Sequence, residues 1–166
     1  MNEYRLDSIE YNDSLNYLYV EFLDVNIYEY VRFNFFGIFI DCVESGNIDP
    51  SANNNYAIGW AAENGQLELV KYLMSLPKSY GIDPSAGNNG AIRWAAENGH
   101  LDVVKYLMSL HKEYSIDPSD RDNYAIRGAV ENGHLETVKY LLSLDKLKSS
   151  LNDDEYNRYK NMISSK

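Results

Sequence analysis

The pattern of apolar and polar positions in the second half of the chain predicts pairs of short helices. Across residues 67–76 the polar residues fall on one narrow stripe at helical spacing, and nearly every other position is apolar. A shorter helix is expected over residues 56–64, ended by Gly65 in a left-handed conformation. Because the second helix has so narrow a polar face, other helices have to cover it on several sides.

This pair of helices recurs three times at a constant spacing. The triplet Ile-Asp-Pro begins at Ile48, Ile82 and Ile116. The copies 50–83, 84–117 and 118–151 align without a gap, and 17 of the 34 positions are identical in all three. Such self-similarity indicates a repeat architecture, in which each unit buries its apolar face against its neighbours.

Each copy opens on residues typical of a turn, with proline and serine followed by a segment rich in asparagine. Asparagine tolerates left-handed backbone and often caps a helix. We therefore expect the asparagine directly before each first helix to be its N-cap. These residues are Asn55, Asn89 and Asn123.

A 34-residue period also belongs to tetratricopeptide repeats, whose two helices are similar in length and leave few residues for loops. Here the first helix ends at Gly65 after about two turns, and Pro77, Gly81 and Pro84 keep the connection between copies out of helix. The pattern fits an ankyrin unit better.

The segment 57–73, Ala-Ile-Gly-Trp-Ala-Ala-Glu-Asn-Gly-Gln-Leu-Glu-Leu-Val-Lys-Tyr-Leu, resembles the ankyrin repeat. The later copies carry the family's Gly-His-Leu step at residues 99–101 and 133–135. The resemblance covers residues 48–151 and implies an all-α ankyrin-repeat solenoid, with helix-turn-helix units stacked side by side. The amino-acid sequence of the copies also resembles that of the ankyrin-repeat proteins of giant viruses that infect amoebae.

The chain departs from the family at the start of each first helix. The usual Thr-Pro-Leu-His is replaced, in the first copy by Tyr-Ala-Ile-Gly at residues 56–59. The hydrogen bonds between Thr and His that normally tie adjacent units are therefore missing, so other contacts have to set the register. Arg93 and Arg127 are candidates to reach carbonyls or acidic groups of the neighbouring copy, with simple exposure as the alternative.

The two ends of the chain differ from the repeats. Residues 1–46 hold all five Phe and six of the fifteen Tyr, with nine acidic and two basic side chains. A shift by one repeat period aligns residues 33–44 with the second helices, which predicts a degenerate first unit acting as a cap, covered by the aromatic segment 15–31. The alternative is a separate partner-binding module.

Residues 152–166 begin like a capping box and are expected to form a short capping helix and tail.

Charge and composition limit the classes of function. The 166 residues include 15 basic and 25 acidic side chains, a net charge of -10, which disfavours nucleic acid as a partner. The longest apolar run, residues 35–40, is too short to span a membrane. Cys42 is the only cysteine, so the chain has no internal disulfide or thiolate metal site. We expect an intracellular, cytoplasmic protein, in the host cell if the source is viral, and a monomer.

The candidate catalytic residues do not form a recognisable active-site motif. His100 and His134 stand at the turn between the two helices of their copies, where a structural hydrogen bond is the expected role. We find no zinc spacing, phosphate-binding glycine loop or nucleophile motif, so we expect neither an enzyme nor a bound cofactor or metal. An enzyme with an unrecognised site is the alternative.

Binding remains as the predicted activity, because positions that vary between copies are free to contact a partner while fixed positions serve the stack. The variable turn residues are Asn53, Asn54, Gly87, Asn88, Arg121 and Asp122. Trp60 and Trp94 are candidate anchors on the first helices. The acidic residues Glu63, Glu97 and Glu131 repeat along the same side and suggest a partner with a basic patch.

The resemblance places these residues on the concave surface with which the family binds proteins. We therefore predict a non-catalytic protein–protein interaction module. Two alternatives remain: an adaptor, in which residues 1–46 recruit host machinery such as a ubiquitin ligase, and a recent duplication without a function of its own.

Overall fold

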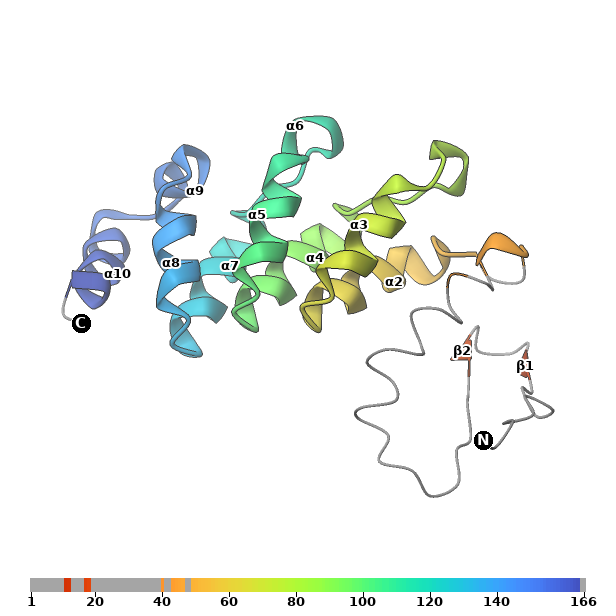
Figure 1. The fold of residues 1–166 in the computed structure, drawn as a ribbon. Helices are drawn as coiled ribbons and strands as arrows, with labels where there is room; N and C mark the ends of the chain where they lie inside the picture. Colours follow the sequence, from red (N-terminus) through yellow and green to blue (C-terminus); the bar gives the residue numbers. More distant parts are fainter. Residues whose placement is uncertain (1–10, 13–16, 19–39, 41–42, 47–48, 165–166) are drawn as a thin grey trace, which may run out of the picture.

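The computed structural model of the protein describes residues 11–12, 17–18, 40, 43–46 and 49–164, and its repeats form a row of helix pairs (Figure 1). The pairs are α2 (Ala52–Glu63) with α3 (Leu67–Ser75), α4 (Ala86–Glu97) with α5 (Leu101–Ser109), and α7 (Asp120–Glu131) with α8 (Leu135–Leu142). No strand occurs in residues 49–164. The predicted all-α solenoid is confirmed.

Within the row, the helices form two layers. The first helices α2, α4 and α7 pack side by side, and the second helices α3, α5 and α8 lie against them and against one another (Figure 1). The helix α10 (Asp153–Ser164) packs on α8 and closes the C-terminal end. Each unit is therefore covered by its own partner helix and by its neighbours.

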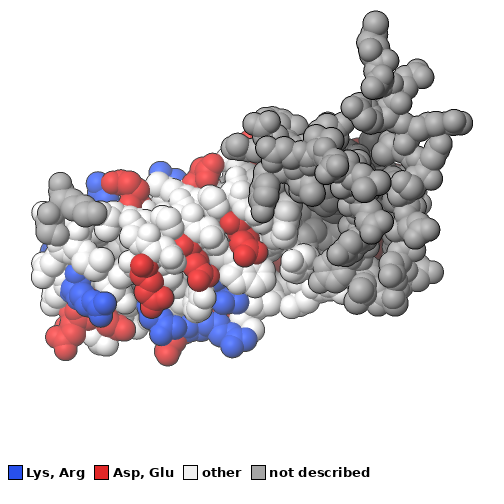
Figure 2. All heavy atoms as spheres, turned by 90° about the horizontal axis from the view of Figure 1, so that it is seen from below, with Lys and Arg blue, Asp and Glu red and all other residues white. Residues whose placement is uncertain are grey.

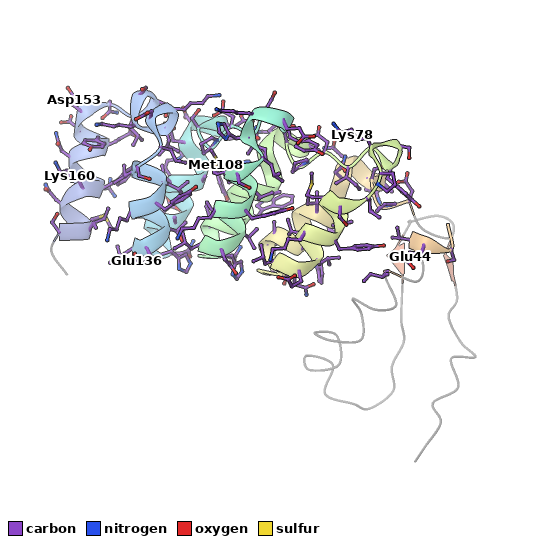
Figure 3. The ribbon with its side chains drawn as sticks, turned by 45° about the horizontal axis from the view of Figure 1, so that its top comes forward. Glu44, Lys78, Met108, Glu136, Asp153 and Lys160 are labelled. Carbon is purple, nitrogen blue, oxygen red and sulfur yellow. The ribbon has the colours of Figure 1, made fainter. Side chains whose placement is uncertain are left out.

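The core repeats with the sequence, because side chains at equivalent positions are buried in every copy and fill the space between successive helix pairs (Figure 3). The fully buried sets are Ile58, Ile92 and Ile126, then Val70, Val104 and Val138, then Leu73, Leu107 and Leu141. Each such side chain contributes about 1.5–3 kcal/mol by burial. Most of this burial depends on the neighbouring copy, as the narrow polar stripe predicts.

The turn inside each helix pair has the left-handed glycine that the sequence predicts, with φ of 67° at Gly65, 76° at Gly99 and 75° at Gly133. At Gly65 and Gly99 the histidine of the following copy packs against the glycine. The His100 ring lies against Gly65, and its Nε2 donates a 3.0 Å hydrogen bond to the carbonyl oxygen of Glu63. The structural role predicted for His100 is confirmed.

The connections between copies are more ordered than the irregular loops that their prolines and glycines predict. They contain the 3₁₀ turn η1 (Lys78–Tyr80) and the short helices α6 (His111–Tyr114) and α9 (Asp145–Ser150). Since these segments differ in sequence between copies, the three connections differ in shape while the helix pairs do not.

The last helix starts at the capping box that the sequence predicts. The Asn152 backbone nitrogen donates to Glu155 Oε2 at 3.2 Å, and the Glu155 nitrogen donates to Asn152 Oδ1 at 2.9 Å. Tyr159, one turn further along α10, is only 4% exposed. This helix covers apolar surface that the last repeat would otherwise leave open.

Part of the N-terminal segment is described. The strands β1 (Tyr11–Asn12) and β2 (Tyr17–Leu18) pair antiparallel, so this segment adds a small element that the all-α prediction did not include. Ile40, Val43 and Glu44 are helical, and Val43 is fully buried. Most of the predicted degenerate unit and its aromatic cover, including Cys42, lies outside the described residues, and its capping role stays a prediction.

Candidate binding surface

The three asparagines predicted as N-caps bond instead to the last residues of their own copies, so that prediction is wrong. The side-chain oxygen of Asn55 accepts a 2.9 Å hydrogen bond from the backbone nitrogen of Asp83, and that of Asn89 accepts a 2.8 Å bond from Asp117. An N-cap needs an extended backbone, whereas these residues are left-handed, with φ of 60° and 58°. Their side chains therefore point to the residue directly before the next unit rather than to their own helix.

The same asparagine position is used again at the last repeat. Asn123 donates from Nδ2 to the carbonyl oxygen of Ser150 at 3.3 Å, and its Oδ1 accepts a hydrogen bond from the Ser150 hydroxyl. Asn89 also donates from Nδ2 to Asp120 Oδ2 at 2.9 Å. Of these bonds, the one from Asn89 to Asp120 joins two copies, and it supplies a contact between units in a chain that lacks the usual Thr and His.

Each repeat opens with three consecutive left-handed residues, which we call the tip: 53–55, 87–89 and 121–123. Asparagine and aspartate tolerate this backbone better than other residues with side chains, and glycine tolerates it best. Of the predicted partner-binding residues in the tips, only Gly87 is half-buried. Asn53, Asn54, Asn88, Arg121 and Asp122 are exposed.

Arg93 does not reach carbonyls of the neighbouring copy, contrary to one of the two expectations, and it is buried rather than exposed. Its Nε donates to the carbonyl oxygen of Asn88 at 2.8 Å and its Nη2 to that of Gly87 at 3.0 Å, both in its own tip. Its guanidinium lies 5.1 Å from the ring centre of Tyr124 in the next copy. Arg127 makes a longer bond of the same kind, 3.4 Å from Nη2 to the carbonyl oxygen of Arg121.

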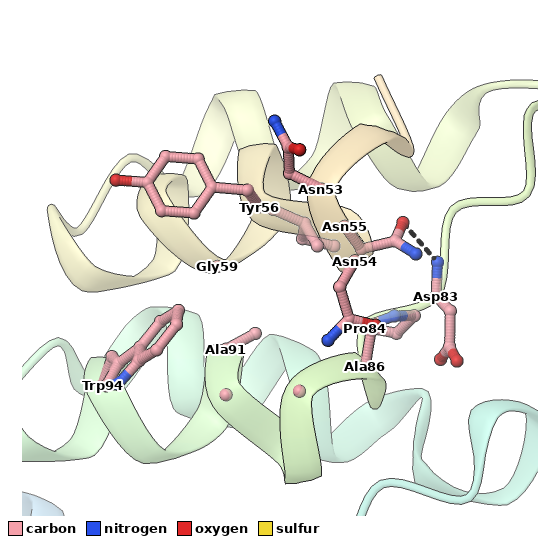
Figure 4. Close-up of a pocket in the computed structure, with 13 residues that line it drawn as sticks. Asn53, Asn54, Asn55, Tyr56, Gly59, Asp83, Pro84, Ala86, Ala91 and Trp94 are labelled. Atoms are coloured by element: carbon pink, nitrogen blue, oxygen red, sulfur yellow. Dashed lines mark hydrogen bonds between the residues drawn. The ribbon is translucent and has the colours of Figure 1, made fainter. Parts of the chain in front are cut away.

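A pocket opens between α2 and α4, where the first two repeats meet (Figure 4). Its volume is about 80 Å³, and Asn53, Asn54, Gly59, Gly90 and Trp94 are among its lining residues. The structure thus brings together four residues that the sequence nominates separately: the exposed tip residues Asn53 and Asn54, and the half-buried Gly87 and Trp94.

The two candidate tryptophan anchors are both half-buried. Trp94 lies directly over Gly59, since a Cβ atom added at Gly59 would be 2.6 Å from Cζ3 of the ring. Trp60 packs against the hydrophobic core. A partner would therefore reach only part of each indole, Trp94 through the pocket that it lines.

The acidic residues form a second feature, at the far end of the first helices from the tips. Glu63 and Glu131 are exposed, whereas Glu97 is half-buried and accepts a 3.1 Å hydrogen bond at Oε2 from the Tyr124 hydroxyl. That bond, followed by burial, raises the pKa of Tyr124. Acidic side chains recur along the face of the stack seen from below in Figure 1, with basic side chains gathered at its edge (Figure 2).

Sequence reasoning missed Tyr56, which also lines the pocket and is 43% exposed. A signal was present, because its position varies between copies as Tyr56, Gly90 and Tyr124. Variation between copies was the reason for predicting the tips as binding residues, and the first residue after each tip varies in the same way.

Comparison with protein families identifies the architecture. A family model described as "Ankyrin repeats (3 copies)" matches residues 29–122 and 58–153, which together cover most of the chain. The chain belongs to the ankyrin-repeat family. Ankyrin repeats are in general protein–protein interaction modules and are typically non-catalytic scaffolds. Comparison with curated proteins and with solved structures gave no match.

The described part of this ankyrin stack offers neither a metal site nor a membrane span. Among the described residues, no group of three or more His, Cys, Asp or Glu is placed to hold a metal ion. None of the described helices combines the length and the apolar character needed to cross a bilayer.

Proposed function

We propose that the protein binds a partner protein through the face formed by its tips and first helices. The observation that carries this proposal is the pocket at the junction of α2 and α4, where exposed tip residues and the Trp94 indole border one opening. A hollow lined by an aromatic ring and by polar groups from a turn is typical of a protein-binding hot spot.

The acidic residues at the ends of the first helices give this face a charge preference. Glu63 and Glu131 are exposed there, so a partner with a basic patch is favoured over an acidic one. Exposed charges are screened by salt, so this part of the binding weakens as ionic strength rises.

The experiment is affinity capture from a host-cell extract with identification by mass spectrometry, using two variants of equal charge. Glu63→Lys with Glu131→Lys reverses the charge of the proposed face. Glu68→Lys with Glu136→Lys reverses two exposed acidic residues on the second helices and is the matched control. We expect a protein that the wild type and the control both retain, that the first variant loses, and that elutes as salt is raised. Equal retention by both variants would contradict the proposal.

The adaptor role is the second candidate, and it concerns residues 1–46, which carry all the phenylalanines and a net charge of -7. In that role, deletion of residues 1–46 abolishes recruitment of host machinery such as a ubiquitin ligase but leaves target capture intact. A cytoplasmic location, a monomeric state and a source in a giant virus belong to the same proposal and rest on the sequence alone.

A further inference from the structure

The two junctions between repeats carry different side chains at equivalent positions. At the second junction, between α4 and α7, Arg93 and Tyr124 face each other. At the first junction, between α2 and α4, the equivalent positions of the preceding copies are Gly59 and Gly90. The pocket of the first junction is therefore found where the second junction holds an arginine and a tyrosine.

The second junction shows how this fold holds a guanidinium group. Arg93 is 9% exposed, and two of its nitrogens donate to the carbonyl oxygens of Gly87 and Asn88 in the tip. The Tyr124 ring, 5.1 Å away, supplies an aromatic face. The Trp94 ring lies 5.9 Å away, so two carbonyl acceptors and two aromatic rings accommodate this buried arginine, with no ion pair to a carboxylate among the described residues.

The first junction has the same acceptor groups without an arginine of its own. Asn53 and Asn54, which correspond to Gly87 and Asn88, both line the pocket. Their backbone has the same left-handed conformation, with φ of 53° and 59° against 64° and 56°. A carbonyl oxygen has two lone pairs, so each can accept a bond from an added donor as well as one within the helix.

The walls of the pocket also suit a planar cation. The Trp94 indole packs over Gly59 and Gly90, which have no side chains to displace it, and it borders the pocket in the role that Tyr124 has at the second junction. Asp83 is a further lining residue, and its Oδ1 accepts hydrogen bonds from the Ser85 backbone nitrogen at 2.9 Å and from the Ser85 hydroxyl at 2.7 Å. Figure 4 shows Trp94 opposite Gly59, with Asn53 and Asn54 at the start of α2.

We propose that this pocket binds an arginine side chain of the partner protein, in the way that the second junction binds Arg93. The inference rests on the proposed function, since it names the chemistry that the tip and first-helix face selects. Arginine is favoured over lysine because its planar fork can donate to two carbonyls at once while stacking on the indole.

The test is a titration of the ¹⁵N-labelled full chain with three capped pentapeptides, Gly-Gly-Xaa-Gly-Gly, in which Xaa is arginine, lysine or citrulline. Citrulline keeps the shape of arginine but has no charge. We expect the arginine peptide to shift the amide signals of Gly59 and Gly90 and the indole signal of Trp94. The lysine and citrulline peptides should bind about tenfold more weakly or not at all. Equal shifts with all three peptides would overturn the proposal.

A triple variant fills the pocket with residues that the protein already uses. Gly59→Arg, Gly90→Tyr and Trp94→Gly together reproduce the set formed by Arg93, Tyr124 and Gly128 at the second junction. We expect the variant to lose binding of the arginine peptide while its thermal unfolding remains cooperative. Asn161→Arg, which adds the same charge on an exposed position of α10, is the control and should bind like the wild type. Retained binding by the triple variant would contradict the assignment to this pocket.

Two further outcomes separate this inference from the proposed function. If the wild type ignores the arginine peptide while the Glu63 and Glu131 variant still loses its captured protein, the arginine inference is wrong and the proposed function stands. If the peptide binds only after Arg5→Gln and Arg32→Gln, the occupant is an arginine of the chain itself, and a partner arginine is excluded.

Discussion

Asn89 links the second and third repeats at their boundary through both ends of its side-chain amide. Its Oδ1 accepts a 2.8 Å hydrogen bond from the backbone nitrogen of Asp117, at the end of the second copy, and its Nδ2 donates to Asp120 Oδ2 in the third copy at 2.9 Å. The residue is 7% exposed. Because its two partners lie on either side of the boundary between copies, Asn89 belongs to the interface on which each unit depends for its stability.

Replacing Asn89 by alanine should destabilise the protein by about 2 kcal/mol, since it leaves the Asp117 nitrogen without its partner. Asn88→Ala is a matched control, because Asn88 is exposed and has nearly the same φ, 56° against 58°. The free energies of unfolding are measured in urea. Equal losses for both variants would mean that left-handed strain, rather than the bond between repeats, accounts for the effect.

The left-handed glycines at the helix turns should differ in their tolerance of alanine. A Cβ atom added at Gly99 would collide with the His134 ring, whereas one added at Gly133 would have no atom within 4 Å. Both glycines have nearly the same φ, 76° and 75°. Gly133→Ala should therefore cost about 1 kcal/mol from strain alone, and Gly99→Ala at least about 1 kcal/mol more.

Adding His134→Ala to Gly99→Ala should remove that excess when the double variant is compared with His134→Ala alone. Thermal or urea unfolding of the four variants forms a double-mutant cycle. A cycle in which the two changes are additive would show that the histidine ring is not the obstacle.

Arg121 should be replaceable with a gain in stability. It is left-handed, with φ 53° and ψ 47°, at a position where the other copies have Asn53 and Gly87. Because asparagine adopts this conformation at lower cost, Arg121→Asn should stabilise the protein by about 0.5 kcal/mol. Arg121→Ala removes the same charge but keeps the strain, so a similar gain from alanine would attribute the effect to charge.

The ion pair of Asp117 and Lys146, 2.7 Å apart, should make stability depend on pH. Burial by itself would raise the pKa of Asp117, but hydrogen bonds from Lys146 and Ser119 hold that pKa below its ordinary value. A lowered pKa in the folded state stabilises the protein above the pKa of the unfolded chain, and this contribution is lost as pH falls through the folded value.

Lys146→Met should therefore cost about 0.5 kcal/mol at pH 7, and the difference from the wild type should shrink below about pH 4. The comparison is made by urea unfolding between pH 2.5 and 7. Lys112→Met changes the exposed lysine at the equivalent position of the preceding copy and is the control. A difference that stayed constant with pH would show that Lys146 acts through packing rather than through the Asp117 charge.

The fold could be predicted from the sequence because its signals are local and are repeated three times. The narrow polar stripe of the second helices, the glycine at residues 65, 99 and 133, and the capping box at Asn152 each depend on a few neighbouring residues. The short helices α6 and α9, which begin at equivalent positions, were not predicted, since the sequences of the connections differ between copies.

The contacts between repeats could not be predicted in the same way, because they depend on which direction a left-handed backbone gives a side chain. A sequence with Asn55 directly before a helix is compatible with an N-cap, and the bond to Asp83 appears only once the helix pair between the two residues has folded. The pocket likewise requires two glycines from different copies, Gly59 and Gly90, to meet across a junction.

The asparagine bonds have a mechanical consequence, because each of them joins positions 27 or 28 residues apart and so closes a loop that contains one helix pair. A chain pulled from its two ends would release these loops one after another, beginning at the end of the stack where fewer neighbouring helices cover the outer repeat. The measured extension of the chain would then increase in several steps of similar size and not in one step.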